Sequence, residues 1–377
     1  MQAILLAAGE GSRLRPFTID KPKPMIRAAN KPILQHAIEA LVANGITEIT
    51  VVLGYQRAKV QAYLGDGVRF GARIAYAFQE VQSGTASALA AAPLPKGPFL
   101  VLGGDNVVDA SLLKAIISAP GDGPAVALHE SDAPQRYGVV TLDGTRVEEI
   151  VEKPDAPRSR WVNTGVYRFP AEFHARVRAA AGRGVAGITD VLDEAIREGV
   201  RIEGVRSSDL WSDAVYPWDL LRVNADLLRA SPPIIETPPG VTIRGPVLIG
   251  EGATLDPGCV LGPGTVIGDD VQVGPHCILE SCVLYQDVQV APFAYVRNAI
   301  LGEGTRVGPR FTSLSGPSSI RQRDGWHDLD DFGAVVGEDC RIGGGVTLLP
   351  GALVGNRVQI AHGKTIAGAL EDGAMVR

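Results

Sequence analysis

The sequence has few of the residues that mark several common classes of protein. Its four cysteines form no C-x-x-C pair, and its six histidines lack the paired spacing of metal ligands. No apolar run approaches the ~20 residues that cross a bilayer, and no charged and then apolar leader opens the chain. The net charge of −6 argues against a nucleic-acid surface, which would need a basic stripe. These absences argue against a disulfide scaffold, a zinc cage, a membrane and a nucleic-acid partner, and they predict a soluble, cytoplasmic protein.

The first 230 residues have the pattern of an α/β domain. At 377 residues the chain exceeds the usual size of a single core, so two domains are expected. Short apolar runs predict strands, and apolar residues at helical spacing predict helices. The strands are expected at 3–8, 49–53, 99–102 and 139–142, and the helices at 33–44, 112–118 and 190–198. This alternation predicts a Rossmann-like, mostly parallel sheet covered on both faces, with ligands at the carboxyl ends of its strands.

After the proline-rich segments 231–233 and 238–240, the period changes to six. Aliphatic residues recur in two registers: Ile249, Leu255, Leu261, Ile267, Val273 and Leu279, then Val336, Ile342, Leu348, Val354, Ile360 and Ile366. This repeat predicts a hexapeptide β-solenoid with three hexads per coil, in which Cys259 and Cys277 stack in adjacent coils. The segment 313–333 breaks the period and is expected to protrude as a loop. We therefore expect domains at 1–230 and 231–377.

The solenoid resembles the left-handed parallel β-helix of sugar and acyl transferases. Members of that class commonly trimerise along the prism axis. The resemblance therefore implies left-handed coils and a homo-oligomer, most simply a trimer or a multiple of it.

The N-terminal segment carries the clearest chemical signal. The apolar run Ala3–Ala8 ends in Gly9-Glu10-Gly11-Ser12-Arg13, and Lys21-Pro22-Lys23 follows. A buried strand that ends in a glycine turn beside cations can present backbone N–H groups to phosphate, so a nucleotide is the expected ligand. Glycine is also common in turns for purely steric reasons, so the two glycines alone are weak evidence for a phosphate site. The segment does not match the dinucleotide fingerprint, because Leu14 occupies its third glycine position, and it is not a Walker P-loop.

The whole string L-A-A-G-x-G-S-R-L-x-P, followed by P-K-P-M, resembles the signature of the sugar-1-phosphate nucleotidylyltransferases. These include glucose-1-phosphate thymidylyl- and uridylyltransferases and the archaeal bifunctional N-acetylglucosamine-1-phosphate uridylyltransferase. The resemblance implies that Arg13 and Lys23 are catalytic cations at the phosphates. It assigns nucleotide binding to Ala8, Gly9, Gly11, Gln79, Gln82, Gly84 and Thr85. A glutamine amide offers a donor and an acceptor, which suits the edge of uracil or thymine.

A magnesium site is predicted at Asp105. This carboxylate follows a buried strand, and Mg²⁺ prefers hard oxygen ligands from few carboxylates together with substrate phosphates. A turn or helix-capping role is the competing interpretation. The resemblance places its partner at Asp219, in Pro-Trp-Asp, with Asp213 as the alternative. It assigns sugar-phosphate binding to Gly138, Glu152, Lys153, Asn163 and Thr164.

The predicted function is transfer of a nucleotidyl group from UTP or dTTP to glucose 1-phosphate or N-acetylglucosamine 1-phosphate, with release of pyrophosphate. Two alternatives stay open: an additional acetyl-CoA-dependent acetyltransferase, and a non-catalytic regulatory or scaffold subunit. Against the first, Pro292 stands where the acetyltransferase histidine is expected, although Tyr295 is retained, and Lys364 is the only lysine after Lys153. His276 and His327 are possible substitutes, yet isolated histidines are more often uninvolved. The sequence does not resolve the nucleotide, the sugar, the oligomeric state or any allosteric effector.

Overall fold

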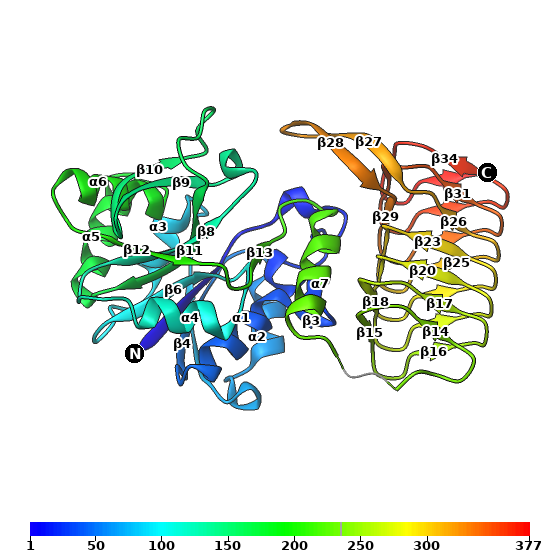
Figure 1. Cartoon of the computed structure of the whole chain (residues 1–377), viewed down its shortest axis with the longest axis horizontal. Helices are drawn as coiled ribbons and strands as arrows, with labels where there is room; N and C mark the ends of the chain where they lie inside the picture. Colours follow the sequence, from blue (N-terminus) through cyan, green and yellow to red (C-terminus); the bar gives the residue numbers. More distant parts are fainter. Residues whose placement is uncertain (234–235) are drawn as a thin grey trace. The chain divides into compact units, whose positions relative to one another are not determined.

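The computed structural model describes residues 1–233 and 236–377 of the chain (Figure 1). They form two compact units. The first, the sheet unit, comprises residues 1–10, 22–25 and 33–212; the second, the solenoid unit, comprises residues 11–21, 26–32 and 213–377. The units therefore interleave along the chain. The division at 230 and 231 follows the order of the sequence and remains our proposal for the domains.

The sheet unit is built on nine strands in the order β5-β4-β1-β6-β11-β8-β12-β10-β9. Their bounds are β1 Gln2–Ala7, β4 Glu48–Leu53, β5 Arg73–Phe78, β6 Phe99–Gly103, β8 Ala125–Glu130, β9 Gly138–Asp143, β10 Arg146–Glu152, β11 Trp161–Phe169 and β12 Glu203–Ser207. Only β10 and β11 run against the other seven strands. The prediction of a mostly parallel sheet is thus confirmed.

Helices cover both faces of this sheet. They are α1 Ile33–Ala43, α2 Arg57–Leu64, α3 Thr85–Ala91, α4 Ala110–Ile117, α5 Ala171–Gly182 and α6 Ile188–Arg197. Successive side chains of a strand point to opposite faces, so Leu5 packs with α1, α2 and α4, whereas Ile4 packs with α3, α5 and α6. Shorter elements are η2 Lys23–Met25, η3 Val68–Phe70, η4 Pro134–Arg136, β7 Asn106–Val108 and β13 Trp211–Asp213. The three helices expected from periodicity are present within two residues of their predicted starts.

The parallel strands bring three loops to one edge of the sheet. In the register of the sheet, Ala7 of β1 lies beside Leu53 of β4, and Leu6 lies beside Gly103 of β6. The residues that follow these strands therefore emerge together at their carboxyl ends. This is the edge at which open parallel sheets bind ligands.

The solenoid unit contains three parallel sheets of seven strands each, as expected for a left-handed β-helix. The first holds β14 Thr242–Ile243, β17 Val260–Leu261, β20 Ile278–Glu280, β23 Tyr295–Arg297, β26 Thr312–Ser313, β31 Thr347–Leu348 and β34 Thr365–Ile366. The second holds β15 Val247–Ile249, β18 Thr265–Ile267, β21 Val283–Leu284, β24 Ile300–Leu301, β29 Ala334–Val336, β32 Ala352–Val354 and β35 Ala369–Leu370. The third holds β16 Thr254–Leu255, β19 Gln272–Val273, β22 Gln289–Val290, β25 Arg306–Val307, β30 Arg341–Ile342, β33 Gln359–Ile360 and β36 Met375–Val376.

All twelve aliphatic residues of the two predicted registers lie in, or pack against, one continuous core. Cys259 and Cys277 are buried in adjacent coils, as the spacing predicts. The period-breaking segment does protrude (Figure 1), but it is an ordered hairpin of β27 Gly316–Gln322 and β28 Gly325–Phe332. The loop prediction erred because polar alternation and a tight turn also produce a solvent-exposed hairpin.

Segments from the start of the chain pack within the solenoid unit. They comprise η1 Ser12–Leu14, β2 Arg27–Ala28 and β3 Lys31–Pro32, and they are accompanied by α7 Asp219–Ala230. Asn356 donates a hydrogen bond to the Pro16 carbonyl at 3.1 Å. Lys21 lies 2.8 Å from both Glu303 and Glu338. Burial alone would lower the pKa of Lys21, but these two carboxylates outweigh it and raise that pKa.

Among the described residues, no helix combines the length and apolar character needed to cross a membrane.

Candidate functional site

Lys23 and Asp105 form an ion pair within the sheet unit, with Nζ 2.7 Å from Oδ2. Lys23 is mostly buried at 13% exposure, whereas Asp105 is 41% exposed. Asp105 is separated from β6 only by Gly104. A Cβ on Gly104 would lie 2.9 Å from that of Ala7, so β1 and this turn are in close contact. Among the described residues, Oδ1 of Asp105 has no hydrogen-bond partner. The pair thus places a cation and an accessible carboxylate oxygen on one unit.

Asn106 links this carboxylate to the Asn-Thr-Gly element. Its side chain donates to the Thr164 carbonyl at 3.0 Å, and Trp211 Nε1 donates to the same oxygen at 3.0 Å. The Thr164 hydroxyl is buried and donates to the Ala127 carbonyl at 2.8 Å. Thr164 therefore holds β11 in place through both its side chain and its backbone. Sequence reasoning missed Asn106, whose only signal was its position directly after Asp105.

Three of the predicted sugar residues come together on neighbouring strands. Gly138 pairs with Glu152 in the register of β9 and β10. A Cβ on Gly138 would lie 3.1 Å from Glu152 Oε2, 3.5 Å from Asn163 Cβ and 3.5 Å from Thr189 Cγ2. The absence of a side chain at position 138 therefore leaves space between these groups. We call Gly138, Glu152, Asn163 and Thr189 the carboxamide cluster.

Thr189 and Tyr167 hold the side chain of Asn163, and neither was predicted from the sequence. Asn163 Nδ2 donates to the Tyr167 hydroxyl at 2.8 Å and to Thr189 Oγ1 at 3.4 Å. Burial raises the pKa of Tyr167 to about 12, so its hydroxyl stays protonated at neutral pH. A signal for Thr189 was available, because Asp190 accepts the Gly187 N–H at 3.1 Å and so marks the start of α6.

Lys153 adds a cation beside this cluster. Its Nζ lies 3.6 Å from Glu152 Oε1, and its side chain is 54% exposed. Its φ of +45° places it in the left-handed region, and its N–H donates to the Tyr137 carbonyl at 2.9 Å. Lys153 is therefore held by its backbone at the end of β10, while its ammonium group remains accessible to an anion.

The predicted nucleobase loop, residues 79–85, is organised by Gln79. This residue is buried, and its amide nitrogen donates to the Gly84 carbonyl at 2.9 Å and also contacts Ser87 Oγ. Both amide protons of Gln79 thus have partners within the loop. Gln82 is exposed and has no hydrogen bond among the described residues. The two predicted glutamines therefore differ, since only Gln82 has both amide groups available.

The far end of this loop docks onto the segment before α6. Gly84 has φ +116° and ψ −178°, and a Cβ there would lie 2.2 Å from the Ala186 carbonyl oxygen. Ala86 N–H donates to that same oxygen at 2.9 Å, and Thr85 Oγ1 accepts from Ile188 N–H at 3.0 Å. The nucleobase loop and the carboxamide cluster are therefore joined, because Thr189 follows Ile188 directly.

The glycine turn after β1 has two different glycines. Gly11 has φ +72°, a conformation that favours glycine, and its carbonyl accepts from Leu14 N–H and Thr18 Oγ1. Gly9 has no positive φ, and a Cβ there would meet nothing within 4 Å. Ala8 is fixed through its carbonyl, which accepts the Tyr55 N–H at 3.2 Å. The backbone therefore favours glycine at position 11 and places no such demand on position 9.

Arg13, Asp213 and Asp219 belong to the solenoid unit. The Nε of Arg13 lies 3.3 Å from Asp324 Oδ2. Asp219 is buried at the start of α7, and its Oδ2 accepts the N–H groups of Val215 and Tyr216, both at 2.8 Å. Asp213 lies 3.7 Å from Arg222. The pairing of Asp105 with Asp219 at a metal stays a prediction.

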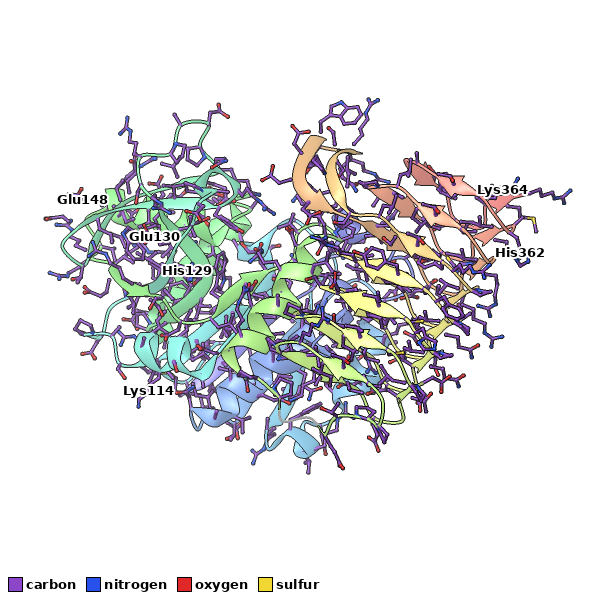
Figure 2. The ribbon with its side chains drawn as sticks, turned by 45° about the vertical axis from the view of Figure 1, so that its right-hand side comes forward. Lys114, His129, Glu130, Glu148, His362 and Lys364 are labelled. Atoms are coloured by element: carbon purple, nitrogen blue, oxygen red, sulfur yellow. The ribbon has the colours of Figure 1, made fainter. Side chains whose placement is uncertain are left out.

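The solenoid residues considered for acetyl transfer have structural roles or stand apart. His276 lies at a coil corner with φ +58° and stacks on Phe293 with ring centroids 5.4 Å apart. The Pro292 carbonyl accepts the Arg310 N–H of the next coil at 3.0 Å. Figure 2 shows Lys364 extending outward from one of the last coils. Pro292, at the position expected for the acetyltransferase histidine, therefore offers no side-chain base.

Comparison with known proteins agrees with the motifs. Residues 2–230 match the family model described as nucleotidyl transferase, and residues 243–317 match that of the GMPPB C-terminal domain. The chain is 36% identical over 268 residues to the "Bifunctional protein GlmU" of Methanococcus maripaludis, covering 68% of this chain and 62% of that protein. It is 39% identical to the "UTP--glucose-1-phosphate uridylyltransferase AglF" of Haloferax volcanii, covering 58% of this chain and 93% of that protein.

A solved structure is also similar. It is a putative glucose-1-phosphate thymidylyltransferase from Bacillus anthracis in complex with a sucrose, with a TM-score of 0.56 and 29% identity, covering 63% of this chain and 98% of that one. The chain spans 61% to 66% of the length of the first relatives that it matches. These matches confirm the predicted resemblance and the predicted fold.

Proposed function

The chain belongs to the nucleotidyl transferase family, and we propose that it transfers a nucleotidyl group from UTP or dTTP to glucose 1-phosphate or N-acetylglucosamine 1-phosphate. A phosphate oxygen of the sugar phosphate attacks the α-phosphorus of the nucleotide and forms a new P–O bond. The bond from the α-phosphorus to the oxygen that bridges to the β-phosphorus breaks. Pyrophosphate departs opposite the attacking oxygen and keeps the electron pair of that bond. No general base is required, because the attacking phosphate is already ionised.

The Lys23–Asp105 pair, 2.7 Å apart, is the observation that carries this proposal. Phosphoryl transfer needs charges that are positioned before the reaction, since negative charge spreads over the phosphate oxygens in the transition state. We assign Lys23 to the α-phosphate and Arg13 to the leaving phosphates. Ala8, Gly9 and Gly11 offer backbone to the triphosphate, and the accessible backbone of Gly9 suits that role because the fold leaves its Cβ position open.

The remaining predicted residues divide between the two substrates. Gln79 and Gly84 shape the nucleobase loop, and Gln82 has the free amide that suits a pyrimidine edge. In the carboxamide cluster, Glu152 would accept hydrogen bonds from sugar hydroxyls and Asn163 would bond a hydroxyl or acyl group. Lys153 would neutralise the sugar phosphate. The relative named as a glucose-1-phosphate uridylyltransferase supports this class of substrate.

Magnesium is the divalent ion that we propose for this reaction, and the donor set fits it. Asp105 presents an oxygen without a partner among the described residues, and no group of three or more His, Cys, Asp or Glu side chains in that part of the chain could cage a metal. A site of few carboxylates and several phosphate oxygens is the type that Mg²⁺ prefers. Asp105 and Asp219 would hold the ion, which when bound neutralises phosphate charge.

We also propose a cellular location and an oligomeric state. A cytoplasmic location suits substrates whose multiple charges do not cross bilayers. A trimer, or a multiple of it, remains our expectation for the solenoid. Acetyl transfer is not favoured, because a proline occupies the position of the required base. A regulatory or scaffold subunit is also less favoured, because such a subunit would not need to retain all four of these residues: Arg13, Lys23, Asp105 and Asp219.

A substrate matrix tests the proposal. Pyrophosphate release is measured for UTP and dTTP against glucose 1-phosphate and N-acetylglucosamine 1-phosphate, with Mg²⁺ present or chelated. We expect turnover with at least one pair, lost on chelation. The substitution Asp105→Asn should lower kcat by about a hundredfold or more while the melting temperature changes little. The exposed Asp122→Asn serves as the matched control. Full activity in Asp105→Asn would refute the role of Asp105, and absence of release from every pair would refute the proposed function.

A further inference from the structure

The tip of the β27–β28 hairpin contacts the predicted phosphate-binding arginine. The hairpin turns at Arg323 and Asp324, after the pairing of Gln322 with Gly325. Asp324 Oδ2 lies 3.3 Å from Arg13 Nε. Both residues belong to the solenoid unit, although they are separated by more than 300 positions in the chain. Asp324, which lies outside the residues 2–230 that match the nucleotidyl transferase family, thus contacts Arg13 of the N-terminal glycine turn.

The hairpin is an addition to the solenoid. Elsewhere a coil advances by about 18 residues, as in the pairing of Val260 with Ile278, whereas Arg306 pairs with Arg341 across the insertion. The coil therefore closes in the same register with the hairpin inserted. At its base, Asn298 donates to Ser315 and to Asp331, both at 2.9 Å. These contacts fix the direction in which the hairpin leaves the solenoid.

Asp324 is held from two sides besides Arg13. The Tyr216 hydroxyl donates to Oδ2 at 2.5 Å, and His327 Nε2 lies 3.1 Å from Oδ1. The hydrogen bond from Tyr216, assisted by that from His327, lowers the pKa of Asp324, so the carboxylate is charged at neutral pH. The His327 ring packs 4.3 Å from that of Tyr216 and 5.6 Å from that of Trp218. The tip is therefore ordered by rings and hydrogen bonds together.

Tyr216 also connects the tip to a predicted metal ligand. Its hydroxyl donates to Asp324, while its backbone N–H donates to Asp219 Oδ2 at 2.8 Å. One residue thus joins the hairpin to the Pro-Trp-Asp turn. The hairpin thus contacts Arg13 directly and is linked to Asp219 through Tyr216.

The part of Arg13 that Asp324 contacts indicates whether Asp324 helps Arg13 to bind phosphate or competes with phosphate for it. Asp324 engages the Nε edge of the guanidinium, which is 53% exposed. Neither Nη1 nor Nη2 makes a hydrogen bond within residues 1–233 and 236–377. An arginine gripped at Nε keeps its two terminal nitrogens for bidentate binding of phosphate, whereas an unheld arginine samples many rotamers. Ion pairs this exposed add little to folding stability, so orientation of Arg13 is the effect that such a contact can supply.

We propose that Asp324 is a positioning residue for the nucleotidyl transfer, which holds Arg13 by its Nε edge so that Nη1 and Nη2 can receive the triphosphate. This inference rests on the proposed function. It adds that one carboxylate of the β27–β28 hairpin takes part in the proposed reaction through Arg13. His327 and Tyr216 act through Asp324 by fixing its orientation.

The test compares Asp324→Asn with Asp324→Glu and with Asp328→Asn, a control that removes the same charge from an exposed position of β28. We expect Asp324→Asn to lower kcat by about tenfold or more, because a misplaced cation loses its contribution to the transition state. The KM for the sugar 1-phosphate should stay unchanged, since that substrate is assigned to the other unit. Asp324→Glu should recover part of kcat, and Asp328→Asn should behave as the parent protein.

A double-mutant cycle with Arg13→Ala shows whether Asp324 acts through Arg13. In the Arg13→Ala background, Asp324→Asn should change kcat by less than twofold, whereas a purely structural role would lower it equally in both backgrounds. Equal activity of Asp324→Asn and Asp328→Asn, or a faster Asp324→Asn enzyme, would overturn the inference while turnover by the parent protein upholds the proposed function. Absence of turnover by the parent protein would instead refute the proposed function, and the inference with it.

Discussion

Replacement of Gly84 by alanine tests how the nucleobase loop is built. In the structure, Gly84 precedes α3 with φ +116° and ψ −178°, a backbone region that essentially only glycine adopts. Its Cα packs directly on the Ala186 backbone. Alanine would therefore have to change the backbone conformation and displace residue 186, and with it the hydrogen bonds of Thr85 and Ala86 to the segment before α6.

Two costs set the size of the effect. Forcing a Cβ into this conformation costs about 1–3 kcal/mol. The new Cβ would lie 2.2 Å from the Ala186 oxygen and 2.7 Å from its carbonyl carbon, and relief of such an overlap costs about 1–3 kcal/mol more. A central value of about 4 kcal/mol lowers the melting temperature by about 8–16 °C for a unit of this size. Because Thr189 follows the displaced segment, the KM values of both substrates should rise.

The assay is thermal unfolding of Gly84→Ala beside Gly9→Ala, with substrate kinetics on both variants. A Cβ at position 9 meets no atom within 4 Å, so the free energy of unfolding of Gly9→Ala should differ from that of the parent protein by less than about 0.5 kcal/mol. Its KM for the nucleotide should nevertheless rise, because the Cβ restricts the approach of phosphate. Gly84→Ala melting within about 2 °C of the parent protein would show that the steric reasoning is mistaken.

Two further predictions concern the carboxamide cluster and a buried histidine. Glu152→Gln should raise the KM for the sugar 1-phosphate by about tenfold and leave that for the nucleotide unchanged, with Glu148→Gln on the same strand as control (Figure 2); equal effects on both substrates would contradict the assignment. His174 is fully buried, and this burial lowers its pKa, so below pH ~6.5 the unfolded chain takes up a proton that the folded chain does not. Stability should therefore fall between pH 7 and pH 5 by up to about 1.4 kcal/mol per unit, and the fall should be smaller in His174→Leu; an equally steep fall in that variant would assign the effect elsewhere.

Much of the fold could be predicted because its repeats are local. The six-residue period fixes which side chains point inward, and every predicted aliphatic position joins the core. The boundary between the units was harder to predict. Residues 11–21 and 26–32 read as part of the first domain, yet they pack with the solenoid through contacts such as that of Asn356 with Pro16. Single residues at such long separations leave no periodic trace in the sequence.

The candidate site divides in the same way. Lys23, Asp105, Glu152 and Asn163 could be named from short motifs, because each motif keeps its residues within a few positions. Thr189 and Asp324 could not, since they come close to their partners only through the fold. The sequence also could not show which glutamine amide is available to a ligand. The amide of Gln79 is bound within the loop because the turn that ends at Gly84 brings the Gly84 carbonyl to it, whereas Gln82 is exposed.

The attachment of Asn356 to Pro16 also constrains how the protein is made. Residue 16 emerges from the ribosome long before residue 356 is synthesised. The segment around Pro16 therefore lacks its final packing until almost the whole chain has been made. During that interval Phe17, which is fully buried against Tyr285 in the finished protein, lies open to water and to other nascent chains. Translation speed and chaperone supply should therefore affect the yield of this protein more than they affect that of a separate domain ending near residue 230.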